Sequence, residues 1–259
     1  MTVLHGKIVL ITGAATGIGA ETVKLLAAEG AVPILTGRRL DKLQEAASRI
    51  SGRHGCYRMD VTDTDEVTRV VQQIAAEYGR IDILLNNAGY GVFELFADAP
   101  IERFQAMMDT NYMGIIRCTK AVLPYMQKQG GGHIINVASM AGKLSTSKSS
   151  GYAATKHAVL GLTNAMRSEF AAMNIYVTAI NPGPIDTPFL HTADPGGQYA
   201  NRVRGYMLKP ARVAETIVNV MKRRKPEVDL PRSASIGIRI YGLFPRLADR
   251  IAGRWLNRK

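Results

Sequence analysis

The sequence is poor in cysteine, and it has neither a long apolar run nor a leader-like N-terminus. Only Cys56 and Cys118 among its 259 residues are cysteine, which excludes a disulfide framework and a zinc cluster built on cysteines. No apolar run reaches the roughly 18 residues needed to span a bilayer. No charged segment with a cleavage site precedes the first apolar run. These absences predict a cytoplasmic protein with free thiols.

The positive charge of the sequence is concentrated near its C-terminus. The net charge is +12, and residues 222–259 alone hold 11 basic and 3 acidic side chains, or +8. The hydrophobic content of 46% is sufficient for the core of one large domain, and no linker divides the chain. We therefore expect a single domain over residues 1–259 that ends in a basic extension at 236–259.

Short β-branched runs alternate with longer helical patterns. The runs KIVLITG, AVPILTG, GCYRMDV, IDILLNNAG, HIINVAS, IYVTAINPG and PEVDLP predict strands, and four of them are almost continuously apolar, as buried parallel strands are. Because Pro33 has no N–H, we expect the paired part of the second strand to begin at Ile34. The alternation of strands and helices predicts an α/β fold with a doubly wound, mostly parallel seven-stranded sheet.

A glycine-rich segment joins the first predicted strand to the first predicted helix. In TGAATGIG, glycines stand at positions 13, 17 and 19. Such a junction needs a tight turn, close approach of the backbone to phosphate oxygens, and a helix N-terminus that favours an anion. Its place between strand and helix predicts a dinucleotide site. The spacing G-x-x-x-G-x-G differs from the usual G-x-G-x-x-G.

This spacing resembles the glycine motif of the short-chain dehydrogenases/reductases, and further motifs of that family follow in order. They are DVT at 60–62, NNAG at 86–89, Asn111 in DTNYMG, Ser139, Tyr152 with Lys156, and NPGPIDT at 181–187. The resemblance covers residues 5 to about 230. It implies a Rossmann-type fold and an oxidoreductase that transfers a hydride between a nicotinamide and a ketone, aldehyde or secondary alcohol.

The resemblance also assigns roles to individual residues. Tyr152 and Lys156, at i and i+4, share one face of a helix. A tyrosine hydroxyl, whose ordinary pKa is about 10, can act as acid or base when a nearby positive charge lowers that pKa, and we expect Lys156 to do this. As in the family, Lys156 also holds the nicotinamide ribose, Ser139 binds the substrate oxygen, and Asn111 anchors a water in the proton relay.

Cofactor contacts are expected from every motif. The expected residues are Gly13, Thr16, Gly17, Ile18, Gly19, Arg38, Arg39, Asp60, Val61, Asn87, Ala88, Gly89, Tyr152, Lys156, Pro182, Gly183, Ile185 and Thr187. At the end of the second strand, Gly37 stands where an acid would receive a ribose hydroxyl, and two arginines follow. Since a guanidinium pairs well with a phosphate, we expect NADP(H) rather than NAD(H), with Arg38 as the main contact.

An alternative interpretation leaves both arginines solvated. In its favour, Thr16 replaces the second basic residue that many NADP-dependent relatives carry in the glycine loop. For the whole chain, the alternative to an enzyme is a dinucleotide-binding regulatory or scaffold protein without turnover. The presence of Asn111, Ser139, Tyr152 and Lys156 argues against it, because such a protein has no chemical need for all four.

Two segments are expected to act outside the catalytic centre. Residues 188–210 have weak periodicity and internal glycines, which predicts a substrate lid. In 236–259, apolar residues at helical spacing lie beside Arg246, Arg250, Arg254 and Arg258. Such a helix suits peripheral contact with an anionic membrane, or it packs on a partner subunit or covers the substrate entrance. We expect a homodimer or homotetramer and no specific binding of nucleic acid.

Overall fold

Seven of the apolar runs form one parallel sheet, as predicted. The structure is a computed structural model and describes residues 2–243. The strands are β1 (Ile8–Thr12), β2 (Val32–Gly37), β3 (Gly55–Arg58), β4 (Ile83–Asn86), β5 (Gly132–Val137), β6 (Ile175–Pro182) and β7 (Glu227–Leu230). Their order is β3-β2-β1-β4-β5-β6-β7, with all pairs parallel. The doubly wound Rossmann-type arrangement is confirmed.

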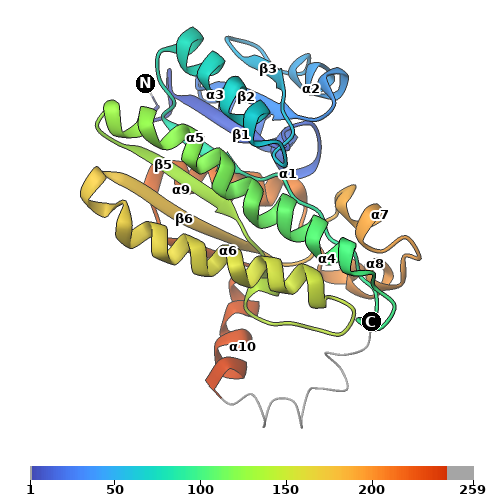
Figure 1. Cartoon of the computed structure of the whole chain (residues 1–259). Coiled ribbons are helices and arrows are strands. Elements are labelled where there is room, and N and C mark those ends of the chain that lie inside the picture. The colour runs from blue at the N-terminus through green and yellow to red at the C-terminus, as the bar shows by residue number, and fades with distance from the viewer. Residues whose placement is uncertain (1, 244–259) are drawn as a thin grey trace.

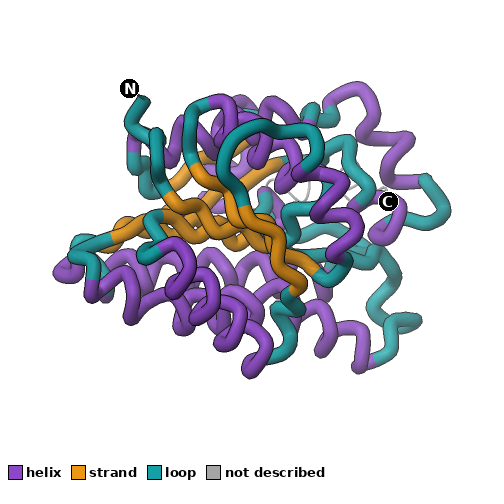
Figure 2. The backbone as a smooth tube through the Cα atoms, turned by 90° about the horizontal axis from the view of Figure 1, so that it is seen from above, coloured by secondary structure: helices purple, strands orange, loops and turns teal. Residues whose placement is uncertain are grey.

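Helices cover both faces of this sheet, so each strand is buried on two sides (Figures 1 and 2). One face carries α1 (Gly17–Ala28), α2 (Leu40–Ala47) and α9 (Pro210–Arg223), and the other carries α3 (Thr64–Tyr78), α5 (Gly114–Lys128) and α6 (Ser150–Glu169). Successive residues of β1 alternate between the two cores, with Val9 and Ile11 in one and Ile8 and Leu10 in the other. This double burial explains why the strands read as continuous apolar runs.

Shorter elements fill the connections. They are α4 (Ile101–Met108), a π-helical turn (Asp109–Met113), α7 (Phe189–Ala193), α8 (Gln198–Val203), α10 (Arg232–Leu243) and 3₁₀ turns at Met140–Gly142, Ala171–Met173 and Arg204–Tyr206. The expected lid at 188–210 thus contains α7 and α8. No helix within residues 2–243 is long and apolar enough to cross a membrane. Most of the basic extension expected at 236–259 lies outside the described residues.

The second strand begins earlier than expected. It starts at Val32, and Pro33 is in register with Val9 of β1. The N–H of Val32 donates to the carbonyl of Lys7, just before β1, at 2.8 Å. Because successive N–H groups of a strand point to opposite sides, an N–H at position 33 would point toward β3. Pairing with β3 starts only at Ile34. Proline is tolerated here because no strand faces it on that side.

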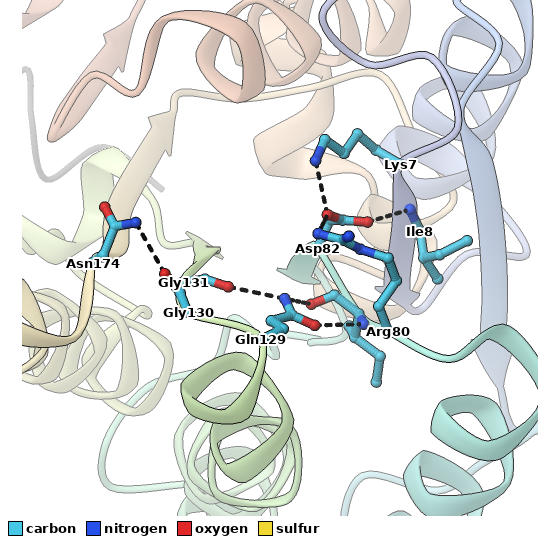
Figure 3. A network of polar contacts seen from close by, with 9 residues as sticks. Lys7, Ile8, Arg80, Asp82, Gln129, Gly130, Gly131 and Asn174 are labelled. Carbon is cyan, nitrogen blue, oxygen red and sulfur yellow. Dashed lines mark hydrogen bonds and ion pairs between the residues drawn. The ribbon is translucent and has the colours of Figure 1, made fainter.

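Polar side chains connect the segments that precede β1, β4 and β5 at the amino edge of the sheet (Figure 3). Asp82 is buried, and its carboxylate accepts hydrogen bonds from Lys7 at 2.9 Å, Arg80 at 2.6 Å and the backbone N–H of Ile8 at 2.9 Å. The Gln129 amide donates to two backbone oxygens beside it. The glycine loop and the predicted catalytic residues all lie at the other, carboxyl edge.

Candidate active site

Three of the predicted catalytic side chains meet at the carboxyl edge of the sheet. Tyr152 and Lys156 lie one turn apart on α6, and Ser139 follows β5. The Ser139 and Tyr152 hydroxyls are hydrogen-bonded, and Lys156 Nζ lies 5.7 Å from the centroid of the Tyr152 ring. The Ser139 hydroxyl also donates to the carbonyl of Pro182 at 3.3 Å, and this contact ties it to the end of β6.

The acid–base properties of this group differ from the expectation. Burial raises the pKa of Tyr152 to about 12, and the hydrogen bond with Ser139 opposes this only in part. Lys156, which was expected to lower this pKa, is not among its causes; its ammonium donates to the Val137 carbonyl at 2.8 Å. Burial lowers the pKa of Lys156 itself to about 8. At neutral pH, Tyr152 is therefore a neutral hydroxyl that can donate a proton.

Asn111 is fully buried in the π-helical turn that precedes α5. Its amide nitrogen donates to the Tyr90 carbonyl at 2.8 Å and to the Thr155 hydroxyl at 3.0 Å, and its oxygen accepts the Tyr90 N–H at 2.9 Å. The Thr155 hydroxyl in turn donates to the Tyr152 carbonyl at 2.8 Å. Asn111 therefore connects the loop after β4 to the turn of α6 that carries Tyr152. Such π turns are frequent at functional sites.

The glycine loop closes tightly over the NNAG segment. Gly13 and Gly17 have φ values of 65° and 57°, which few other residues adopt. A Cβ on Gly13 would lie 2.9 Å from the backbone of Ala88, and one on Gly19 would collide with the carbonyl of Gly13. The Asn87 amide donates to the Gly13 carbonyl at 3.0 Å. The expected phosphate-binding loop thus has glycine where the backbone requires it.

Thr12 joins the same two segments, although sequence reasoning did not single it out. Its hydroxyl accepts the backbone N–H groups of Asn87 and Ala88, both at 3.0 Å. Gly89 completes the contact with the catalytic side, since a Cβ there would lie 3.0 Å from the Asn111 side chain. The signal in the sequence was weak, because a threonine at the end of an apolar strand is common.

The DVT segment forms a turn after β3. The Asp60 carboxylate accepts the N–H and the hydroxyl of Thr62 at 3.0 and 2.8 Å. Val61 is buried against Gly114 at the start of α5. These contacts fix the backbone of Asp60 and Val61, two of the residues expected to contact the cofactor.

Arg38 and Arg39 are exposed immediately after Gly37, the last residue of β2. Burial raises the pKa of Tyr90, and the positive charges of Arg103 and Arg38 oppose this. Arg38 therefore acts on the loop after β4, which borders the crevice between β1 and β4. At this point the strand order reverses, and ligands of doubly wound sheets bind there.

The NPGPIDT segment at 181–187 lies between Ser139 and the glycine loop in space. The N–H of Gly183 donates to Leu230 at 2.7 Å, and Ile185 forms a bridge with Leu208 of the lid segment. A Cβ on Gly17 would lie 3.3 Å from the Thr187 methyl group. The segment thus borders the catalytic group, residues 188–210 and the first turn of α1.

A charged cluster holds the loop after Ser139. Lys143 pairs with Asp229 at 2.6 Å and also with Glu227, and both carboxylates lie on β7. The buried Asn181 amide donates to the same two carboxylates at 2.8 Å. Asn181 precedes Pro182, whose carbonyl accepts the Ser139 hydrogen bond. The end of β6 therefore connects the charged cluster to Ser139.

The residues present fit a dinucleotide. The glycine loop leaves room where a Cβ would intrude, the first turn of α1 has no acidic side chain to repel a phosphate, and two exposed arginines follow β2. Thr16 precedes α1 without capping it through its side chain, and Ile18 packs toward the core. These are the requirements of a phosphate site at a helix N-terminus.

Comparisons with known proteins agree with this geometry. The short chain dehydrogenase family model matches residues 7–196. An uncharacterized oxidoreductase of Staphylococcus saprophyticus is 36% identical over 227 residues, with 86% of this chain and 94% of that protein covered. A 3-oxoacyl-(acyl-carrier-protein) reductase of Thermotoga maritima is 38% identical over 221 residues, with 83% and 90% covered.

A solved structure shares the fold over nearly the whole described chain. The crystal structure of a short-chain type dehydrogenase/reductase from Mycobacterium marinum superimposes with a TM-score of 0.81 at 33% identity, and the match covers 87% of this chain and 94% of that one. Proteins of this kind use NAD(P) as cofactor. The chain belongs to the short-chain dehydrogenase/reductase family and is an oxidoreductase of that family.

Proposed function

We propose that the protein is an NADP(H)-dependent oxidoreductase of ketones, aldehydes or secondary alcohols, with Tyr152 as the acid/base. The observation that carries this proposal is the hydrogen-bonded pair of Ser139 and Tyr152 at the carboxyl edge of the sheet, with the Lys156 ammonium beside it. When bound, the nicotinamide supplies or accepts the hydride. The similarity to a 3-oxoacyl reductase supports carbonyl reduction as the chemistry.

In the direction of reduction, Tyr152 donates its proton to the substrate oxygen. Its pKa of about 12 keeps the hydroxyl protonated at neutral pH, so the acid is present in full. Ser139 orients that oxygen through its own hydroxyl. Lys156, held by the Val137 carbonyl, places its ammonium beside the ring. This charge does not lower the pKa of the resting hydroxyl, but it can stabilise the negative charge that develops on the Tyr152 oxygen in the transition state.

Replacing Tyr152 with Phe tests this role. The variant keeps the ring and its packing but loses the proton donor, so we expect kcat for ketone reduction to fall by at least about a hundredfold. Cofactor binding, measured by fluorescence titration, should change little. Undiminished turnover of a working substrate by Y152F would refute Tyr152 as the acid/base.

The NADP(H) proposal rests on Arg38 and Arg39, which follow Gly37 at the end of β2, the position where an acid would receive the ribose hydroxyl of NAD(H). We expect a higher kcat/KM with NADPH than with NADH. Replacing Arg38 with Leu should raise KM for NADPH about tenfold or more and leave KM for NADH almost unchanged, because only NADPH carries the 2′-phosphate on the adenosine ribose. Replacing the exposed Arg49 of the same region is the matched control. A preference of the unmodified enzyme for NADH contradicts the proposal.

A further inference from the structure

Aromatic rings from three separate segments surround the Tyr152 side chain. Phe93, in the loop after β4, lies with its ring centroid 6.0 Å from that of Tyr152 at an interplanar angle of 72°. Phe189, on α7, lies 5.5 Å away at 57°. Tyr199, on α8, lies 5.0 Å from Phe93 at 75°. These are the edge-to-face and tilted geometries that aromatic pairs prefer.

The backbone is shaped to bring these rings together. A Cβ on Gly91 would lie 2.9 Å from both Phe189 Cζ and Tyr152 Cδ2, so only glycine lets the two rings approach the loop this closely. The N–H of Phe93 donates to the carbonyl of Ala193 at 2.7 Å. This bond attaches the loop after β4 to the end of α7. The lid expected at 188–210 therefore contacts the Tyr152 side chain through Phe189, and its Tyr199 contacts Phe93.

Phe93, Phe189 and Tyr199 are each partly buried, and only Tyr199 among them has a polar group. Burial raises the pKa of the Tyr199 hydroxyl, with further increases from Tyr206, Tyr152 and the Asp194 carboxylate. Tyr199 therefore stays neutral near the reactive hydroxyl. A substrate whose oxygen is bound by Tyr152 and Ser139 would have its remaining atoms close to these rings, since Phe93 and Phe189 both contact Tyr152.

We propose that the enzyme selects substrates in which a flat apolar ring is attached to the carbonyl or carbinol carbon, and that Phe93, Phe189 and Tyr199 determine this specificity. The inference rests on the proposed function of the same site. A ring adds a further edge-to-face partner to the existing arrangement and has few torsions to immobilise. A linear chain of equal size gains burial but loses the freedom of several torsions.

Two methyl ketones with eight carbons, acetophenone and octan-2-one, isolate this effect. Both place a carbonyl next to a methyl group, and they differ in whether the other substituent is a ring or a linear chain. We expect kcat/KM to be about tenfold higher for acetophenone. Its ring gains one additional aromatic pair, and it avoids the loss of torsional freedom that the linear chain of octan-2-one undergoes on binding. Cyclohexyl methyl ketone, with a ring that is not aromatic, should fall between them.

Replacing Phe189 or Phe93 with Leu should remove the preference. Leu keeps an apolar surface without a ring, so we expect KM for acetophenone to rise several-fold while KM for octan-2-one changes less than about twofold. Phe96→Leu is the matched control, because Phe96 is 74% exposed and its ring pairs with Phe104 instead of with Tyr152. Tyr199→Phe, which keeps the ring, should retain the preference.

The outcomes separate this inference from the proposed function. Turnover of both ketones with equal kcat/KM, or an equal loss for both in Phe189→Leu, overturns the inference and leaves the oxidoreductase intact. Lack of turnover with all three ketones and their alcohols, with either cofactor, contradicts the proposed function. In that case, calorimetric Kd values of the cofactor-saturated Tyr152→Phe variant for the same ketones still decide the ring preference.

Discussion

Burial governs the two titratable groups at the reacting centre in opposite directions. A neutral tyrosine and a neutral lysine are both easier to bury than their ions, so the pKa of Tyr152 rises to about 12 and that of Lys156 falls to about 8. Tyr152 is therefore an acid beside an ammonium only below about pH 8, where Lys156 keeps its proton. This protonation state is the one that the proposed reduction of a carbonyl requires.

A pH profile tests this pairing. We expect kcat/KM for ketone reduction to be nearly constant from about pH 6 to 7.5. Above about pH 8 it should decrease, with a limiting slope of about tenfold per pH unit, as Lys156 loses its proton. The sign follows from the lowered pKa, because the ammonium exists only below it. Tyr152 does not titrate in this range. Stopped-flow measurement of NADPH oxidation at saturating cofactor gives the profile.

Lys156→Met is the control for this profile. With no ammonium to lose, the variant should be slow at every pH and should show no step near pH 8. A profile of the unmodified enzyme that stays flat to pH 9.5 would mean that the charge of Lys156 does not contribute to the rate.

The residues that sequence reasoning missed act through local geometry. Thr12 and Thr155 hold backbone groups with their hydroxyls, and a threonine in a strand or helix looks the same whether or not it does so. The pKa of Tyr152 could not be predicted for a related reason. The Y-x-x-x-K spacing indicates that the lysine is near, but not how deeply the hydroxyl is buried or which carbonyl holds the ammonium.

At the scale of elements, the cluster of Lys143 with β7 positions the loop that carries Ser139. Burial tends to lower the pKa of Lys143, but hydrogen bonds and charge interactions with Asp229 and Glu227 raise it. The lysine is therefore cationic at neutral pH. The N–H of Ala141, between Ser139 and Lys143, donates to the Ser139 hydroxyl at 3.1 Å. Movement of Lys143 would thus be transmitted to Ser139.

We expect Lys143→Met to lower kcat about three- to tenfold with little change in KM for the cofactor, because a small displacement of Ser139 misplaces the substrate oxygen. Lys143→Arg should restore much of the loss by keeping the charge. A fall in Tm without a change in kcat would show that the cluster only stabilises the fold. Lys42, which is partly exposed and pairs with Glu45 on α2, provides the control substitution Lys42→Met.

The ends of α3 carry local signals in the sequence. Asp63 caps α3 through a hydrogen bond with the N–H of Glu66 at 2.9 Å, and Gly79 ends it at a φ of 76°. The start of β2 was predicted wrongly, because the tolerance for Pro33 depends on where β3 begins. The π-helical turn at Asn111 was likewise not predicted, since it depends on contacts with Tyr90 and Thr155 across the fold.

At the scale of the whole molecule, the strand order brings distant segments to one edge. The reversal between β1 and β4 places the glycine loop beside NNAG, and β5 and β6 place Ser139 beside Pro182. The alternation of apolar runs was enough to predict this architecture, since parallel strands with crossover helices have few other arrangements. The contacts of residues 188–210 could not be predicted, because aromatic residues at irregular spacing in the sequence do not indicate which parts of the fold they will contact.

The basic C-terminal segment gives the last test at this scale. Residues 222–259 carry a net charge of +8, and each basic side chain near an anionic membrane contributes about 1 kcal/mol of binding. The membrane interpretation predicts that the full chain sediments with phosphatidylserine-containing vesicles but not with pure phosphatidylcholine, and that high salt releases it. A chain lacking residues 244–259 should stay in solution, and replacing the four arginines at 246, 250, 254 and 258 with Gln should weaken binding at least about tenfold. Equal binding of the shortened chain removes the interpretation. If the full chain does not bind vesicles and is an oligomer in light scattering, while the shortened chain is a monomer, the segment packs on a partner subunit.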